Sequence, residues 1–207
     1  MGTKNVLIDV KEKDTCTVVS IKKPTSRYLN EFLNLKCAPD LLLMKLFPNV
    51  KEITESFATY RAFLYHFDRS LPLHDKDTIL ISVGDGRTPR TAATFAYRSR
   101  FECHSVDPLL KDIPKWKSID RLHFHPIRIE EFNLDLKGKK VVLVAVHSHA
   151  NLNFAWNTIV SNGGDIKAVI ALPCCVPQDL DMTPKFVYSD WGIWSPEREF
   201  KIWDFTH

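Results

Sequence analysis

Two glycines and one aspartate of this sequence have the spacing of a nucleoside-binding site. Gly84 and Gly86 follow an apolar run at 78–83, and a second apolar run at 102–106 leads directly into Asp107. Glycines at a strand-to-helix turn let the chain turn sharply and let a ligand approach the backbone, and the free N–H groups of the helix start then face that ligand. A carboxylate about twenty residues further on accepts the hydroxyls of a ribose. The segment Thr78–Pro108 therefore predicts a strand–helix–strand unit that binds a nucleoside.

A purely structural interpretation of the same residues stays open. Gly84 and Gly86 would then form a tight loop only, and Asp107 would cap a turn with Pro108. The nucleoside interpretation is favoured because strand, turn, helix, strand and acid all occur in order, whereas two nearby glycines recur by chance.

The motif Val83-Gly84-Asp85-Gly86-Arg87-Thr88 resembles motif I of the class I S-adenosylmethionine-dependent methyltransferases, and Asp107 resembles the ribose-binding acid of that family. Thr88 or Pro89 replaces the last glycine of the motif, and the acid stands between the glycines. The aspartate that commonly holds the adenine amino group is absent, so Glu130 or Glu131 is expected in its place. The resemblance implies S-adenosyl-L-methionine as the cofactor, in a pocket formed by Gly84, Asp85, Gly86, Arg87, Thr88, Asp107, Glu130 and Val146.

Histidines and cysteines follow the fourth and fifth predicted strands. His147 and His149 come after the run at 140–146, and Cys174 and Cys175 come after the run at 166–172 and a proline. These segments are similar to a subgroup of methyltransferase-like proteins with His-x-Cys-Gly-x-Leu after the fourth strand and Pro-Cys-Cys after the fifth, although His149 and an alanine replace Cys-Gly. Ligands lie beyond the carboxyl ends of such strands. The similarity therefore implies that His147 and His149 lie beside the methyl acceptor, where one acts as the base.

Three other interpretations of these side chains stay open. His147, His149, Cys174 and Cys175 together offer ligands for Zn²⁺, although adjacent cysteines chelate awkwardly and no metal site is assigned. Cys174 is also a candidate covalent nucleophile. In the simplest interpretation, one histidine bonds the backbone and both thiols are buried as small hydrophobic groups.

Other polar and aromatic residues have favoured structural interpretations. His123 and His125 share a face of the third predicted strand, where satisfied sheet histidines are favoured over a metal or proton site. Aromatic side chains of the C-terminal segment are expected in a hairpin core, with stacking on a planar acceptor as the alternative: Phe186, Tyr188, Trp191, Trp194, Phe200 and Trp203. A solvated helix face, as opposed to phosphate binding, is expected for Arg87, Arg90, Arg98 and Arg100.

Alternating apolar runs and helical segments indicate the architecture that positions these residues. Strands are expected at 78–83, 102–106, 122–129, 140–146 and 166–172, and a hairpin at 185–188 and 199–205. Buried runs rich in Val and Ile indicate a parallel sheet covered on both faces. The predicted fold is an α/β, Rossmann-like doubly wound and mostly parallel sheet with a C-terminal antiparallel hairpin, flanked by helices. This strand inventory is that of the class I methyltransferases.

The N-terminal part of the chain has a different pattern. Two β-rich pieces at 6–8 and 15–21 with a charged turn at 11–14 predict a small hairpin, or one strand after an arm. Helices are expected at 27–35 and 41–47, and an amphipathic helix at 54–67. We expect residues 1–52 to form an N-terminal extension packed on the core, and residues 53–207 to form a Rossmann-like methyltransferase domain.

Composition limits the function classes. The 207 residues are 44% hydrophobic and carry a net charge of +3, so the chain can bury a core and shows no basic stripe dedicated to nucleic acid. Five cysteines without a CxxC pair indicate neither a disulfide framework nor a zinc ribbon. No apolar leader or long apolar run is visible, so we expect a cytoplasmic, intracellular protein in a reducing compartment, without membrane association.

Two functional hypotheses follow. The first is an S-adenosylmethionine-dependent methyltransferase whose acceptor is RNA or a small molecule. The second is a catalytically inactive methyltransferase-like domain that serves as a binding or scaffold subunit for a protein partner. A dehydrogenase is disfavoured because the C-terminal hairpin is antiparallel and a third glycine is missing.

Overall fold

A seven-stranded sheet forms the centre of the computed structural model, which describes residues 7–13, 16–22 and 25–206, the first two segments by their backbone alone. The strands lie in the order β5-β4-β3-β6-β7-β9-β8. Their bounds are Thr78–Val83 for β3, Glu102–Val106 for β4, Leu122–His125 for β5, Lys140–Val146 for β6, Asp165–Leu172 for β7, Phe186–Ser189 for β8 and Glu199–Asp204 for β9. The strands from β3 to β7 are parallel, and β9 is antiparallel to both β7 and β8.

The strand order confirms the predicted fold class. Counted along the chain, the seven strands have the order 3-2-1-4-5-7-6, the Rossmann-like arrangement of class I methyltransferases. All six residues of β3 are buried, as expected for a central strand with both faces covered. The C-terminal pair is the predicted antiparallel hairpin, with β9 inserted between β7 and β8.

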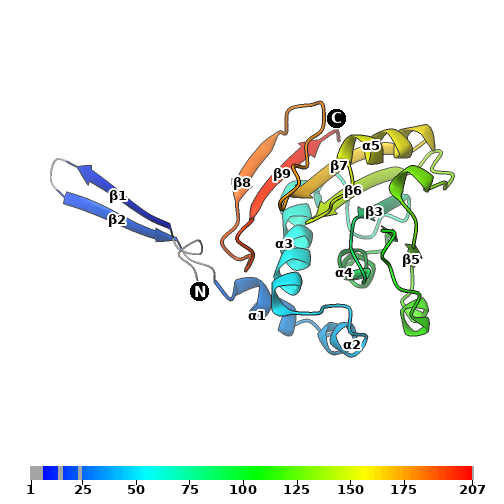
Figure 1. Ribbon diagram of the computed structural model, residues 1–207, viewed down its shortest axis with the longest axis horizontal. Coiled ribbons are helices and arrows are strands. Elements are labelled where there is room, and N and C mark those ends of the chain that lie inside the picture. Colours follow the sequence, from blue (N-terminus) through cyan, green and yellow to red (C-terminus); the bar gives the residue numbers. More distant parts are fainter. Residues whose placement is uncertain (1–6, 14–15, 23–24, 207) are drawn as a thin grey trace.

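Helices cover both faces of the sheet (Figure 1). Helices α3 (Val50–Phe67) and α4 (Arg90–Arg98) pack on one face, and α5 (Leu152–Ser161) packs on the other. Successive side chains of a strand point to opposite faces, so Leu80 joins the apolar cluster under α3 and α4 whereas Ile79 and Ile81 join the cluster under α5. Among the described residues, no helix is long and apolar enough to span a bilayer.

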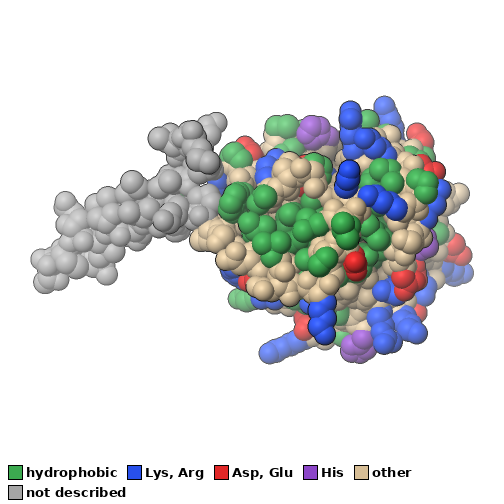
Figure 2. All heavy atoms as spheres, turned by 90° about the horizontal axis from the view of Figure 1, so that it is seen from below, with side chains coloured by type: hydrophobic (Ala, Val, Ile, Leu, Met, Phe, Trp, Pro, Cys, Tyr) green, Lys and Arg blue, Asp and Glu red, His purple; other side chains and the backbone are tan. Residues whose placement is uncertain are grey.

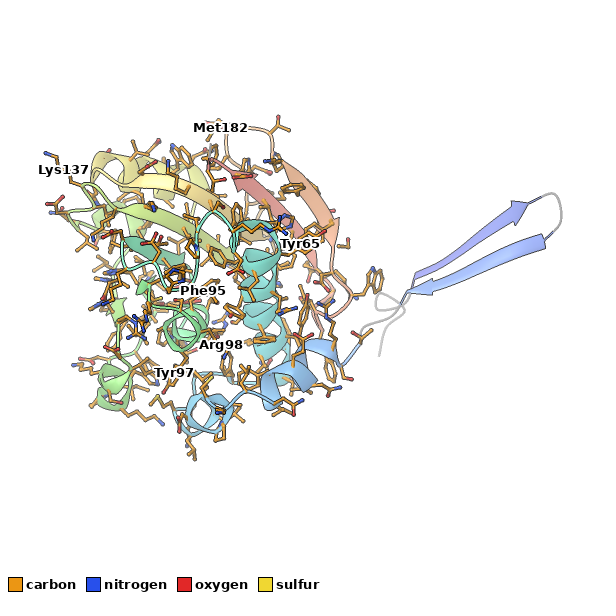
Figure 3. All side chains as sticks on the ribbon, turned by 180° about the vertical axis from the view of Figure 1, so that it is seen from behind. Tyr65, Phe95, Tyr97, Arg98, Lys137 and Met182 are labelled. Carbon is orange, nitrogen blue, oxygen red and sulfur yellow. The ribbon has the colours of Figure 1, made fainter. Side chains whose placement is uncertain are left out.

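Aromatic rings hold α3 and α4 together. Phe95 of α4 lies between the two helices in Figure 3, with its ring centroid 5.4 Å from that of Tyr60 and 5.6 Å from that of Phe63. Both contacts have the edge-to-face geometry that aromatic pairs prefer. This packing holds α4 against α3.

The N-terminal segments form a separate hairpin and two short helices. Strands β1 (Leu7–Lys13) and β2 (Cys16–Lys22) pair antiparallel with each other, and α1 (Arg27–Leu33) and α2 (Ala38–Leu43) lie beside α3 (Figure 1). Figure 2 views the molecule from the side of α1 and α2 and shows apolar side chains gathered on that face. Leu43 of α2, 76% exposed, is among the exposed apolar residues of the chain. The division at residue 52 stays a prediction.

Several predicted bounds are wrong, each for a local reason. Helix α3 begins at Val50, well before the predicted 54, because the Asn49 side chain accepts a hydrogen bond from the Glu52 N–H and caps the helix. Strand β5 ends at His125 instead of 129, because Pro126 has no N–H to continue the ladder.

Two further bounds are shifted near the N-terminus. Residues 11–13 belong to β1, not to a turn, and α2 begins at Ala38, before the predicted 41. Val6, Asp14 and Thr15 of the predicted hairpin lie outside the described residues.

Phe95→Ala is expected to destabilise the protein by roughly 3–5 kcal/mol, because it removes a fully buried ring from between two helices. Tyr65→Ala is the matched control, since Tyr65 of α3 is 85% exposed and should change the free energy of unfolding by less than about 0.5 kcal/mol. Urea unfolding of both variants measures the difference. Equal effects of the two substitutions would show that the α3–α4 contact is not a main source of stability.

Candidate functional site

A cleft of about 370 Å³ opens beyond the carboxyl ends of four parallel strands. Gly84 follows β3, Asp107 follows β4, Glu130 follows β5 and Asn151 follows β6, and all four line the cleft with Phe154 of α5. The strand order reverses between β3 and β6, which is the place where ligands bind in open α/β sheets. The volume is that of a site for one small organic molecule.

Asp107 is fixed at this cleft by backbone hydrogen bonds. Its Oδ2 accepts from the Gly86 N–H at 2.9 Å, and its Oδ1 accepts from the Leu109 N–H at 2.7 Å. A carboxylate has about four acceptor positions, so these two bonds leave capacity for two ligand hydroxyls. The turn-capping and the ligand-binding interpretations of Asp107 are therefore compatible.

Asp85 faces the protein interior. Its carboxylate is buried and accepts hydrogen bonds from the Thr91 and Ala92 N–H groups, each at 3.3 Å, and from the Ser105 hydroxyl at 2.9 Å. A negative charge at the start of α4 is stabilised by the helix dipole and by these free N–H groups. The structure thus places Asp85 under the loop, where it caps α4.

The two motif glycines have different surroundings. Both have left-handed backbone angles, with φ of +73° at Gly84 and +76° at Gly86, where glycine is favoured. A Cβ at Gly84 would lie only 2.0 Å from the Ser148 Oγ, so the Ser148 side chain fills the space that this glycine leaves.

Arg90 fills the other side of the loop. Its guanidinium donates to the Asp85 carbonyl, and its Nε lies 3.6 Å from the Glu52 carboxylate. The expectation of a solvated face is wrong for Arg90, which is buried. Arg87 is exposed, whereas Thr88 and Val146 are buried and do not line the cleft.

The two candidate bases, His147 and His149, lie in different environments. His147 has a left-handed φ of +50°, and its Nε2 lies 3.4 Å from the Glu55 Oε1. His149 lines the cleft and is exposed, with its Nε2 3.5 Å from the Cys175 Sγ. Of the two, only His149 lines the cleft.

The buried Glu55 and the half-buried His147 form a pair that the sequence pattern did not single out. Burial raises the pKa of the Glu55 carboxyl to about 7 and lowers the pKa of the His147 imidazole to about 4. Within the described residues, neither the Glu55 Oε1 nor the His147 Nε2 has a hydrogen-bond partner, although the Lys51 Nζ lies 3.5 Å from the same Glu55 oxygen as an ion pair. The only signal in the sequence is one carboxylate inside a helical segment, residues 53–60, whose other residues are apolar or small.

His123 and His125 share a face of β5, as predicted, and His104 of β4 joins them. The His104 Nδ1 lies 3.0 Å from the His125 Nε2, and the His123 Nε2 lies 2.7 Å from the Glu102 Oε2. Each imidazole has a polar partner, which agrees with the interpretation as satisfied sheet histidines. Burial lowers the pKa of His104 to about 3.

The C-terminal aromatic residues are divided between core and surface. Phe200 and Trp203 are buried, as expected for a hairpin core, whereas Trp194 is 43% exposed. Cys175 is exposed and Cys174 is half-buried, so the interpretation of two buried thiols is wrong.

No family model matches this chain, and no curated protein is similar to it. Among solved structures, a mutant of MtNAS in complex with S-adenosylmethionine is 10% identical with a TM-score of 0.47, over 86% of this chain and 70% of that chain. An RNA methyltransferase from Salinibacter ruber in complex with S-adenosyl-L-homocysteine is 17% identical with a TM-score of 0.41, over 67% and 88%. Coclaurine N-methyltransferase is 12% identical with a TM-score of 0.39, over 86% and 60%.

Glu55→Gln keeps the size of the side chain and removes its titration. Because the pKa of Glu55 is about 7 in the folded protein and about 4.3 in an unfolded chain, the folded state binds more protons in this window and loses stability as the pH rises through it. We expect the variant to gain about 2–3 kcal/mol relative to the wild type between pH 5 and pH 8. Urea unfolding at both pH values tests this, and a constant difference would contradict it.

His104→Gln tests the opposite pH dependence. The pKa of His104 is about 3 in the folded protein and about 6.5 when unfolded, so the folded state binds fewer protons and loses stability as the pH falls from 6.5 toward 3. Between pH 7 and pH 5 the wild type should lose about 2 kcal/mol more than the variant. Equal losses in thermal or urea unfolding would mean that His104 is accessible to protons in the folded state.

Proposed function

We propose that this chain binds S-adenosylmethionine in the cleft beyond β3, β4, β5 and β6 and transfers its methyl group to RNA or a small molecule. The observation that carries the proposal is the position of the cleft at the reversal of the strand order, with the Asp107 carboxylate at its wall. Asp107 accepts the ribose hydroxyls in this proposal. The exposed Glu130 accepts the adenine amino group, and the half-exposed ring of Phe154 stacks on the base.

The acceptor end of the proposed site lies toward His149. Methyl transfer needs an acceptor held in line with the sulfonium and, for a weak nucleophile, a base within hydrogen-bond reach. His149 is exposed in the cleft and fits this role better than His147, which is half-buried against Glu55. His147 is then a positioning residue behind the acceptor.

A second candidate function is favoured by the filled space around the glycine loop. The Ser148 side chain occupies the approach to Gly84, and the Arg90 guanidinium lies over the loop near Gly86. A ligand with a methionine tail must displace these groups, whereas a bare nucleoside does not. This arrangement favours a catalytically inactive domain that binds a nucleoside and serves as a binding subunit.

Isothermal titration with S-adenosylmethionine, S-adenosylhomocysteine and adenosine separates the two candidates. A methyltransferase should bind both S-adenosyl ligands at least about tenfold more tightly than adenosine, because the tail contributes contacts. Equal affinity for adenosine would favour the inactive nucleoside-binding domain. Absence of binding for all three ligands at millimolar concentration would exclude both.

Two substitutions test the placement of the nucleoside. Phe154→Ala should weaken S-adenosylhomocysteine binding by about tenfold or more, since stacking of a base on an aromatic ring contributes about 1–3 kcal/mol. Val160→Ala on the exposed side of the same helix is the control and should leave the affinity unchanged. Asp107→Asn should also weaken binding by about tenfold or more, because it removes a charged acceptor. Unchanged affinity in both cleft variants would place the ligand elsewhere.

A further inference from the structure

We propose that His149, Cys174 and Cys175 bind one Zn²⁺ ion at the carboxyl ends of β6 and β7. The His149 Nε2 and the two Sγ atoms all lie within 4.8 Å of one another. Thiolate and imidazole ligands together are typical of zinc sites. This site goes beyond the proposed function and does not need a nucleoside in the cleft. With Zn²⁺ on its Nε2, His149 no longer acts as the base proposed above, and the methyl acceptor is then one that needs positioning alone.

Two of the three distances between the ligand atoms fit a single tetrahedral ion. Two thiolates bound to Zn²⁺ at about 2.3 Å lie about 3.8 Å apart, and a thiolate and an imidazole nitrogen lie about 3.6 Å apart. The Sγ atoms of Cys174 and Cys175 are 3.8 Å apart, and the Cys175 Sγ is 3.5 Å from the His149 Nε2. The two sulfurs are also far beyond the bond length of a disulfide, so they are free thiols.

The sheet brings the two ligand segments together from distant parts of the sequence. Val146 and Leu172 are paired at the ends of the parallel strands β6 and β7, and the His147 N–H donates to the Leu172 carbonyl at 2.8 Å. The chain then leaves both strands at the same edge of the sheet, where their carboxyl ends lie. His149 and the two cysteines are therefore neighbours in space because of the strand pairing.

A buried amide holds the backbone around His149. The Gln178 Nε2 donates to the Ser148 carbonyl at 2.8 Å and to the Ala150 carbonyl at 3.1 Å, and the Gln178 side chain is buried. Groups behind the ligands that fix their orientation are a regular feature of metal sites. The loop that carries the imidazole is thus positioned before an ion binds.

The fourth position of the ion faces open space. His149 and Cys175 are exposed, and both cysteines line a cavity of about 410 Å³ that Glu197 also lines. Three protein ligands with an open position leave room for a water molecule or for the Glu197 carboxylate. His147, the fourth residue of the set considered from the sequence, lies against Glu55 instead.

Titration of the reduced full-length protein with Co²⁺ alone tests the site, with Zn²⁺ as the competitor. We expect one ion per chain, an absorption band from thiolate-to-cobalt charge transfer, and loss of that band when Zn²⁺ is added. Cobalt binding without the thiolate band would overturn the proposal.

Matched variants identify the ligands. Cys174→Ser, Cys175→Ser and His149→Ala should each lower the Zn²⁺ affinity by at least about a hundredfold. Substitution of a residue that only supports a ligand typically lowers metal affinity by about 10- to 100-fold, so a larger loss identifies a ligand. Cys37→Ser and His123→Ala, a thiol and an imidazole elsewhere in the chain, are the controls and should bind as the wild type does. The ligands are at the surface, so circular dichroism should show folded variants. Unchanged affinity in Cys175→Ser would overturn the proposal.

Discussion

The carboxylate of Asp85 links three segments at the carboxyl ends of the strands: the loop after β3, the start of α4 and strand β4. The geometry of the cleft depends on this link. It accepts hydrogen bonds from two N–H groups at the start of α4 and from the Ser105 hydroxyl of β4, while its own backbone belongs to the loop after β3. A buried charge is tolerated only where such partners compensate for lost hydration. The loop between Gly84 and Gly86 is consequently fixed, and the Gly86 N–H is directed at Asp107.

Three polar environments lie side by side beyond β3 and β6. The cleft contains the carboxylates of Asp107 and Glu130, the interior beside α3 contains Glu55 with His147, and the surface beyond β7 contains thiols. The left-handed backbone at His147 separates these environments, because it turns one imidazole inward and leaves the next histidine in the loop exposed. Such a conformation is rare for a residue with a side chain and costs about 1–2 kcal/mol.

The fold was largely predictable because most of its strands are continuous apolar runs in the sequence. Runs rich in Val such as 141–146 are apolar on both faces, which is typical of a parallel strand covered on both sides. The start of α3 was not predictable, because a proline followed by Asn49 is as typical of the end of one element as of the cap of the next. Local patterns mark the elements but leave their terminal residues ambiguous.

The candidate site was predictable in position but not in the direction of its side chains. The sequence places Asp85 and Asp107 beside the same glycine loop, and nothing in the spacing distinguishes a carboxylate that caps a helix from one that faces a ligand. Glu55 was missed for a different reason. A pattern that marks apolar positions on a helix has no means to mark a polar side chain that is buried by its tertiary contacts.

The close approach of Ser148 to Gly84 packs the loops after β3 and β6 directly against each other, so that they move together. Since the serine side chain takes the place of a Cβ, neither backbone can move toward the other, and a ligand that separates them must shift residues on both sides. Ser148 is the neighbour of His149 in the chain, so a shift at the glycine loop is transmitted to the imidazole at the surface. By thermodynamic linkage this effect is reciprocal. A ligand that fixes His149 therefore changes the free energy needed to separate the glycine loop from Ser148.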